Sequence, residues 1–468
     1  MEVSGSQMIL GLVIGVILLI LLVLKTKIHA FIALIIAASV TGIIGGMNPS
    51  NVVTEITNGF GSTLGSIGIV IGFGVMMGRL LEVSGAAEKM AYTLIKKLGQ
   101  KKEEWAMAAA GYIVSIPIFV DSAFVILNPL VKALSRKTGK SVIALGVALG
   151  IGLAATHHAV PPTPGPLGVA GIFGADIGLM ILVGLIFSFP IILAGVWYAK
   201  WIGNKIYQIP EEDGDGDEFV RPDKKQVYQN FLEASEEREK SLPSFTISIM
   251  PILLPIILIF LNTTIGALDE SGALAVNETL LSYIQFFGNP IIAVGIGLIA
   301  AIYTLSTNEN RENTLERMEE GIKTAGIILL VTGAGGALGN VLRASGTGDY
   351  IAEQIAGWPL PAILVPFFIA TLVRLVQGSG TTAMITAASI SAPILGSLDV
   401  SLVLAAQASA LGAMVFSYFN DSLFWVVNRM LGIKNVKEQI MVWSVPTTIG
   451  WGVALVMLLI ADSVVRMF

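Results

Sequence analysis

Long apolar segments recur along almost the whole chain. Each is near or above the length of about 20 mostly apolar residues that a helix needs to cross a bilayer. Six precede one polar stretch and six follow it: about 8–24, 28–46, 62–81, 105–135, 141–175 and 177–200, then about 245–262, 281–304, 323–343, 361–397, 402–430 and 443–465. Only 13% of the 468 residues are charged, against about 25% in a soluble domain. The pattern predicts an all-α polytopic membrane protein and excludes a soluble enzyme.

Composition narrows the function further. The net charge of −5 offers no basic surface for nucleic acid. The chain has no cysteine and only three histidines, so we expect no disulfide, no metal and no cofactor. The first apolar segment has no basic residues before it and no small-residue cleavage site after it, so we expect a retained helix rather than a signal peptide.

The polar stretch divides the chain into three parts. Eleven of the 33 acidic residues lie between Glu211 and Glu239, without the order of ligands that a calcium-binding loop requires. We therefore predict a first inverted repeat over 1–202, a solvated cytoplasmic linker over 203–244, and a second inverted repeat over 245–468.

In each half one segment is predicted to turn back within the membrane. The segment 105–135 has basic residues on both sides, and basic loops favour the cytoplasm, so both of its ends lie on one side. Pro117 opens the helix and predicts a re-entrant hairpin with its tip at about Pro117–Ser122. The matching hairpin of the second half, over 361–397, has its tip at Gln377–Thr382.

The fifth segment of each half is interrupted. Four prolines between Pro161 and Pro166 stop the first helix, and the polar run Ser417–Ser422 interrupts the second. Irregular backbone at membrane depth is tolerated only where it is buried in protein or lines a wet cavity. These interruptions therefore point to a binding site.

The two halves also repeat in sequence. Gly72–Gly85 matches Gly333–Gly346 with a constant offset of 261 residues, as from Gly72 to Gly333. Basic loops place the N-terminus outside, so the two hairpins enter from opposite sides. We expect two inverted repeats with roughly ten full spans and two hairpins, an arrangement typical of secondary transporters.

Acidic or titratable side chains at three places in the chain are candidates for moving a proton. A carboxylate at membrane depth costs about 2.5–3.5 kcal/mol, so Asp121 in the first tip is expected to face a cavity. His157 and His158 titrate near neutral pH, which suits a proton relay. Asp421 lies in the second interruption. The open alternative for all four is that they cap helix ends.

The second tip has the chemistry to bind a carboxylate. Its glycines expose backbone N–H groups, its hydroxyls add donors, and a helix N-terminus carries partial positive charge. Arg374 lies about one turn earlier, and either neutralises the anion or reaches toward the interface. The predicted substrate-binding residues are Asp121, Ser122, His157, His158, Thr163, Gly165, Ser379, Gly380, Thr381, Thr382, Asn420, Asp421 and Ser422, with Asp121, His158 and Asp421 as proton-coupling candidates.

These motifs resemble the gluconate permease family of gluconate:proton symporters, nearly end to end. The likeness is carried by His157–Pro166, Pro117–Ser122, Val373–Ser379 and Asn420–Trp425. The resemblance implies an importer of gluconate or another small hydroxy acid, with one branch taking D-serine. It also implies the wider ion transporter superfamily, whose members move a substrate-carrying domain of hairpins and broken helices against a scaffold.

Two positions depart from the family pattern. Thr163 stands between Pro162 and Pro164 where many members have a histidine, and Gly380-Thr381 replaces the expected Ala-Thr. Both lie in the expected pocket, so the polyhydroxy acids as a class are the expected substrates.

The sequence therefore predicts a proton-coupled importer of a small hydroxylated monocarboxylate in the inner membrane. Its partners would be an organic anion, a proton and the lipid bilayer. Sodium coupling, or a D-serine or glycerate substrate, is the alternative within transport. A passive channel and an intramembrane aspartyl hydrolase using Asp121 and Asp421 are remote alternatives. Scaffolds of this kind usually dimerise, so a homodimer is left open beside a monomer.

Overall fold

The computed structural model describes residues 4–98, 102–211, 219–222, 241–270, 276–307, 310–356, 361–418 and 421–466. The described chain is almost entirely helical, and its two short strands, β1 (Ile209–Pro210) and β2 (Phe219–Val220), pair antiparallel. The helices before the strands are α1 (Gly5–Lys25), α2 (Ala30–Ile44), α3 (Pro49–Val83), α4 (Ala86–Leu98), α5 (Glu103–Val114), α6 (Val120–Thr138), α7 (Val142–Ala159), α8 (Pro164–Phe173) and α9 (Ile177–Lys205).

The helices after the strands follow the same sequence of long, short and interrupted elements. They are α11 (Phe245–Glu270), α12 (Glu278–Gly288), α13 (Pro290–Leu305), α14 (Arg311–Ala344), α15 (Thr347–Ala356), α16 (Leu364–Gln377), α17 (Gly380–Leu395), α18 (Leu402–Gly412), α19 (Ser422–Met430), α20 (Val436–Gln439), the π-helical turn η1 (Ile440–Ser444) and α21 (Val445–Val465). The all-α membrane fold predicted from the sequence is confirmed.

Among the described residues, six helical segments are long and apolar enough to cross a membrane, and eight if two bent pairs are each counted as one span. The bends are 45° within α3 and 59° between α12 and α13. Of the ten segments expected to span fully, the other two are α2, which has 15 residues, and the divided pair α18 and α19. The bend before Pro290 is a feature that the hydropathy pattern does not predict.

Polar residues and prolines begin several of these helices. Asn48 accepts a hydrogen bond from the N–H of Ser50 with Pro49 at the first helical position, and Asn289 does the same before Pro290. These residues satisfy N–H groups that a helix start leaves open. The chain therefore marks the beginnings of α3 and α13 locally.

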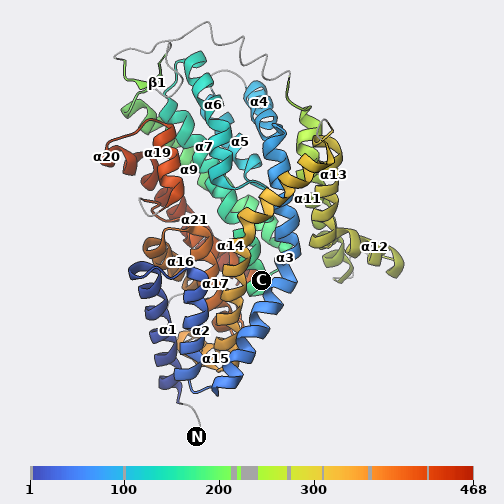
Figure 1. Cartoon of the computed structure of the whole chain (residues 1–468), viewed down its shortest axis with the longest axis vertical. Coiled ribbons are helices and arrows are strands. Elements are labelled where there is room, and N and C mark those ends of the chain that lie inside the picture. Colours follow the sequence, from blue (N-terminus) through green and yellow to red (C-terminus); the bar gives the residue numbers. More distant parts are fainter. Residues whose placement is uncertain are drawn as a thin grey trace.

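The longest helices, α3 and α14, pack antiparallel and run between the two ends of the molecule (Figure 1). At one end Arg79 donates to Glu320 at 2.9 and 3.0 Å. At the other end the Asn340 side-chain amide donates to the Glu55 carboxylate at 2.7 Å. Between them a Cβ on Gly59 would lie 2.5 Å from the carbonyl oxygen of Gly336, so only glycine permits this close packing.

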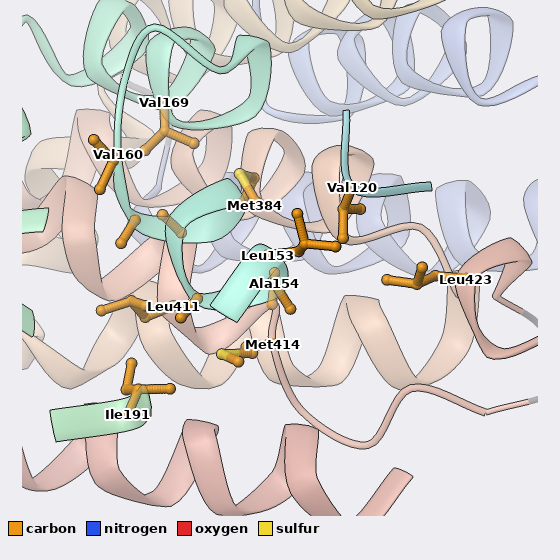
Figure 2. Close-up of a cluster of buried hydrophobic side chains, with 14 of the residues drawn as sticks. Val120, Leu153, Ala154, Val160, Val169, Ile191, Met384, Leu411, Met414 and Leu423 are labelled. Atoms are coloured by element: carbon orange, nitrogen blue, oxygen red, sulfur yellow. The ribbon is translucent and has the colours of Figure 1, made fainter. Parts of the chain in front are cut away.

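The most buried helices surround the interrupted segments. Every residue of α7 is buried, and α17 is buried from Ala383 to Leu395. Apolar side chains from α7, α17 and α18, including Leu153, Met384 and Leu411, meet in one cluster (Figure 2). A Cβ on Gly152 would overlap the carbonyl oxygen of Ala108, and close packing of this kind holds the interrupted helices in place.

The turns after α3 and α14 have the same hydrogen bonds at matched positions. The N–H of Ser84 donates to the oxygen of Leu80 at 3.1 Å, and Gly85 follows with φ +76°. In the second half the N–H of Ser345 donates to the oxygen of Val341 at 2.9 Å, and Gly346 has φ +70°. Each pair is separated by the offset found in the sequence, so the sequence repeat is accompanied by a repeat in local structure.

Within the polar linker the structure describes residues 203–211, 219–222 and 241–244. Its strands fold back onto the second half, where Arg221 makes two hydrogen bonds to the Glu438 carboxylate at 2.8 and 2.7 Å. Gln208 donates to the carbonyl oxygen of Leu431 at 2.6 Å. Most of the acidic run lies outside the described residues.

Candidate functional site

The first hairpin is formed by α5 and α6. The chain turns between Ser115 and Phe119, slightly earlier than the predicted tip. Asp121 and Ser122 therefore belong to the first turn of α6 rather than to the loop. A carboxylate in the first turn interacts favourably with the open N–H groups of the helix.

The second hairpin is formed by α16 and α17, with the turn where the sequence predicts it. Gly378 has φ +83°, a conformation that glycine adopts without strain. The Ser379 hydroxyl oxygen accepts from the N–H of Thr382 at 3.3 Å and from its hydroxyl at 3.0 Å. The side chain of Ser379 thus caps α17, and Gly380 and Thr381 form its first turn.

In the first interruption, between α7 and α8, side chains form hydrogen bonds to carbonyl oxygens of the same segment. The buried Thr163 hydroxyl donates to the carbonyl oxygen of Val160 at 2.5 Å, with a longer contact to that of His157 at 3.3 Å. The Nδ1 atom of His158 lies 2.8 Å from the carbonyl oxygen of Ala154. Donation from Nδ1 to this oxygen makes Nε2 the acceptor nitrogen of a neutral ring.

The second interruption runs from the end of α18 to Asp421 and is held by side chains. The Asp421 carboxylate caps α19 by accepting from the N–H of Leu423 at 3.2 Å. Its other oxygen accepts from Arg374 Nη2 at 2.5 Å and from the hydroxyl of Ser417. The indole N–H of Trp443 donates to that hydroxyl at 2.9 Å.

The Arg374 side chain points into the protein and pairs with Asp421. This side chain is only 5% exposed and its ion pair with Asp421 is buried. The interpretation that Arg374 reaches out to the membrane interface is therefore wrong. Asn420, which was predicted to bind substrate, lies outside the described residues.

The two hairpin tips and the two helix interruptions meet in one region. The Ser422 hydroxyl donates to the Asp121 carboxylate at 2.8 Å and joins the two halves of the chain. A Cβ on Gly380 would lie 2.7 Å from His158 Nε2, so the second tip contacts the first interruption. A Cβ on Gly165 would lie 3.6 Å from the methyl group of Thr381. The structure thus brings together most of the residues that the sequence singles out.

The aromatic rings of this region form a short row. The His157 and His158 ring centres are 5.6 Å apart in an edge-on arrangement, and Phe119 lies 6.2 Å from His157. The row therefore joins the first tip to the first interruption.

Several polar atoms here lack a hydrogen-bond partner among the described residues. They are Nε and Nη1 of Arg374, Nε2 of His158 and Nδ1 of His157. An unsatisfied buried polar group costs about 1–3 kcal/mol and more when charged, so these atoms are suited to a ligand that supplies the missing bonds. The Arg374–Asp421 pair is neutral overall, which leaves Asp121 as the additional acidic group.

A cavity of about 280 Å³ reaches this region from one side. Phe119 and Ser122 of the first tip form part of its wall, and Arg79, Glu82 and Glu320 form the rest of its polar lining. Among the described residues no three His, Asp or Glu side chains gather in a way that could hold a metal ion.

Comparison with known proteins identifies the family. A family model described as GntP family permease matches residues 7–464. The chain belongs to this family. The permease is accordingly a multi-pass transport protein of the inner membrane rather than an enzyme.

Relatives cover nearly the whole chain. The permease is 54% identical over 457 residues to an uncharacterized permease of Haemophilus influenzae, covering 97% of this chain and 92% of that one. It is 33% identical to a gluconate permease of Pseudomonas aeruginosa, with 98% of both chains covered. It is also 33% identical to the high-affinity gluconate transporter of Escherichia coli, with 93% and 95% covered.

Solved structures with the same fold are more distant in sequence. MtrF of Neisseria gonorrhoeae has a TM-score of 0.67 at 13% identity, with 94% of this chain and 96% of that one covered. The YdaH transporter of Alcanivorax borkumensis has a TM-score of 0.64 at 12% identity, with 92% and 97% covered. At these identities the likeness shows the fold alone.

One residue of the permease site carries no clear signal in the sequence. Trp443 donates to the Ser417 hydroxyl, 26 residues earlier, and completes the hydrogen bonds around Asp421. Trp443 lies in an apolar segment and looks like an ordinary core residue. The position of Arg374 was signalled by a lone arginine beside a predicted tip, although its partner was not.

Proposed function

We propose that this permease imports gluconate or a related small hydroxylated monocarboxylate together with protons. The observation that carries the proposal is the buried guanidinium of Arg374, which pairs with Asp421 through one nitrogen and has two others without a partner among the described residues. Hydrogen bonds between a guanidinium and a carboxylate are roughly twice as strong as neutral ones. A substrate carboxylate would supply the missing acceptors.

The second tip completes the carboxylate site in this proposal. Arg374 lies three residues before the end of α16, and the exposed first turn of α17 follows. A helix N-terminus adds partial positive charge near the bound anion. Substrate hydroxyls would bond to the polar side chains around it, which are Thr163, Ser379, Thr381, Thr382 and Ser422. Asn420, which lies outside the described residues, stays a prediction from the sequence.

The proton would be carried mainly by Asp121. Since Arg374 and Asp421 neutralise each other, an ionised Asp121 would repel the entering anion. Protonation of Asp121 removes that repulsion and couples the two ligands. His158, through its open Nε2 atom, is the second candidate, whereas Asp421 is already paired with a cation.

The inverted repeats remain part of the same proposal. Residues 1–202 and 245–468 would be the two copies, joined by a cytoplasmic linker over 203–244. The matched turns after α3 and α14 and the pairing of hairpins and interruptions support this division. Two such copies provide two arrangements of one site, each favoured by a different set of bound ligands.

Uptake into proteoliposomes tests the proposal. Labelled gluconate, glycerate, threonate, D-serine and citrate are each supplied under an inward proton gradient, with and without sodium. We expect accumulation of a hydroxy acid that an uncoupler abolishes and sodium does not change. Accumulation only with sodium would overturn the proton coupling, and accumulation of citrate or D-serine alone would overturn the substrate class.

A further inference from the structure

A second cavity, of about 230 Å³, lies near the other end of the α3–α14 pair. Ser62 and Thr63 of α3 and Asn340 and Arg343 of α14 form its polar wall. The first cavity, beside Arg79, lies between the opposite ends of the same two helices. The two cavities therefore lie on opposite sides of the candidate site, at either end of the same helix pair.

The sequence repeat relates the linings of the two cavities. With the offset of 261 residues, Arg79 corresponds to Asn340 and Glu82 corresponds to Arg343. All four of these residues line a cavity. The corresponding residues thus lie at equivalent places in the fold but differ in charge. The cation Arg79 corresponds to the neutral Asn340, and the carboxylate of Glu82 corresponds to the cation Arg343.

The balance of charge differs between the two linings. In the first cavity Arg79 is paired with Glu82 at 2.8 Å and with Glu320 at 2.9 Å. Glu320 also lies 3.3 Å from Arg317, which is outside the lining. Two carboxylates and one cation therefore line this cavity, and that cation is paired. In the second cavity Arg343 is exposed and makes no ion pair with any described residue. The nearby Glu55 carboxylate accepts from the Asn340 amide and is not part of the cavity wall.

We propose that the cavity around Arg343 is a recruiting site for the substrate carboxylate, on the face from which substrate is taken up. The inference rests on the proposed function and adds a second, shallower anion site to it. Basic residues in the 305–322 loop place the start of α14 in the cytoplasm, and the end of α14 at Arg343 therefore faces outside.

Two helices in the wall of this cavity begin at the candidate site. Its other residues include Gly171 and Ile172 of α8 and Pro393 of α17. Since α8 begins at Pro164 and α17 at Gly380, these residues lie about 10 Å and about 20 Å along helices that start at the site. A carboxylate held at Arg343 would thus be about 10–20 Å from the site, measured along these helices.

An unpaired cation raises the local concentration of anions, and screening by salt weakens the effect. The acidic lining of the first cavity does the opposite and favours release of an anion into the cytoplasm. The difference in lining charge would therefore speed inward transport without changing the central site.

The test is initial uptake of labelled gluconate by intact cells that carry the full-length permease. The variants are R343Q, R343K and, as a charge control, R466Q, whose exposed arginine ends α21 outside both cavities. Rates are compared at about 0.01 M and about 1 M salt, where the Debye length is about 30 Å and about 3 Å.

At low salt we expect R343Q to raise KM about 3- to 10-fold with kcat unchanged, and R343K to behave as wild type. High salt should remove the difference. In inside-out vesicles, where substrate arrives at the other cavity, R343Q should keep the wild-type KM. A purely structural role, such as interaction with the C-terminal dipole of α14, would lower thermal stability without this salt-dependent change in KM.

The recruiting site is overturned if R343Q matches wild type in intact cells at low salt, if R466Q raises KM equally, or if the KM change appears on both faces. Failure of wild type to take up any hydroxy acid would instead overturn the proposed function, and this inference with it. The two failures are therefore distinguishable.

Discussion

The two helix interruptions are stabilised by hydrogen bonds from different parts of the chain. Between α7 and α8 the chain satisfies itself, through Thr163 and the backbone around it. Between α18 and α19 the chain depends on side chains from elsewhere, since Asp421 and Ser417 bond to Arg374 and Trp443. The first interruption is thus stabilised by local hydrogen bonds, and the second is stabilised by tertiary contacts.

The two interruptions also differ in which hydrogen-bonding atoms have no partner among the described residues. The self-contained interruption presents imidazole nitrogens that no described residue contacts, and the supported one presents two nitrogens of Arg374. Both sets of open atoms come from the inner surfaces where the halves meet. The candidate site therefore has two walls. The wall formed by α7 and α8 is held by its own hydrogen bonds, and we call it the rigid wall. The wall formed around Arg374 and Asp421 depends on their buried ion pair, and we call it the supported wall.

Removing the cation of the supported wall should have the largest effect. R374Q leaves Asp421 as an unpaired buried charge, which costs about 3–5 kcal/mol. We expect loss of both thermal stability and gluconate uptake. Uptake by proteoliposomes and the melting temperature in detergent measure the two losses separately.

The double variant R374Q/D421N separates binding from folding. It removes both charges, so we expect stability to recover while uptake stays absent. Recovery of uptake would contradict a role of Arg374 in binding the substrate.

The contact between the rigid wall and the second tip should give the next largest effect. In G380A the added methyl group would lie 2.7 Å from His158 Nε2, blocking that nitrogen. Nε2 of the neutral ring could accept from a substrate hydroxyl, and leaving a buried acceptor without its donor costs about 1–3 kcal/mol, so we expect KM to rise about 5- to 150-fold. G72A is the matched control, because a Cβ there meets nothing within 4 Å. Equal effects of the two variants would contradict the contact.

The self-contained interruption was predictable from sequence, while the supported one was predictable only in part. Four prolines stop a helix wherever they occur, so the position of the α7–α8 interruption follows from local chemistry. The α18–α19 interruption begins at Ala413, four residues before the predicted run. Gly412 precedes that start, but a single glycine does not stop a helix as four prolines do. Contacts with distant residues, such as the hydrogen bond from the N–H of Ser417 to Thr447, hold it instead.

The same distinction applies to the site. The glycines and hydroxyls of the second tip, and a carboxylate in the first, were predicted from local sequence. The pairing of Arg374 with Asp421 was not, because it depends on how two segments 47 residues apart pack. Hydropathy places helices along the chain, whereas side-chain partners depend on tertiary packing.

Neutralising Asp121, whose carboxylate bonds to Ser422, should separate substrate movement from proton movement. In D121N the side-chain oxygen still accepts from Ser422, but no proton can be gained or lost. We expect gluconate counterflow to continue while accumulation driven by a proton gradient is lost. S422A is the control, since it removes the same hydrogen bond, at a cost of about 1.5–3 kcal/mol when Asp121 is ionised, but leaves the titratable carboxyl in place and should preserve coupled accumulation. Coupled accumulation by D121N would assign the proton to another group, with His158 the next candidate.

The smallest effect is expected from loosening the supported wall without removing its charges. Trp443→Phe deletes the indole donor to Ser417 but keeps an aromatic ring at this buried position. W451F is a matched control, because the indole of Trp451 donates to the Thr371 hydroxyl at 2.8 Å, away from Asp421. Each substitution should cost about 1–3 kcal/mol of stability, as expected when a buried acceptor loses its donor. Only W443F should also raise the KM for gluconate, by about 2- to 3-fold, because a fraction of a kcal/mol in the position of Arg374 has that effect. If both variants leave KM unchanged, the supported wall tolerates loss of this bond, and its geometry is fixed by the Arg374–Asp421 pair alone.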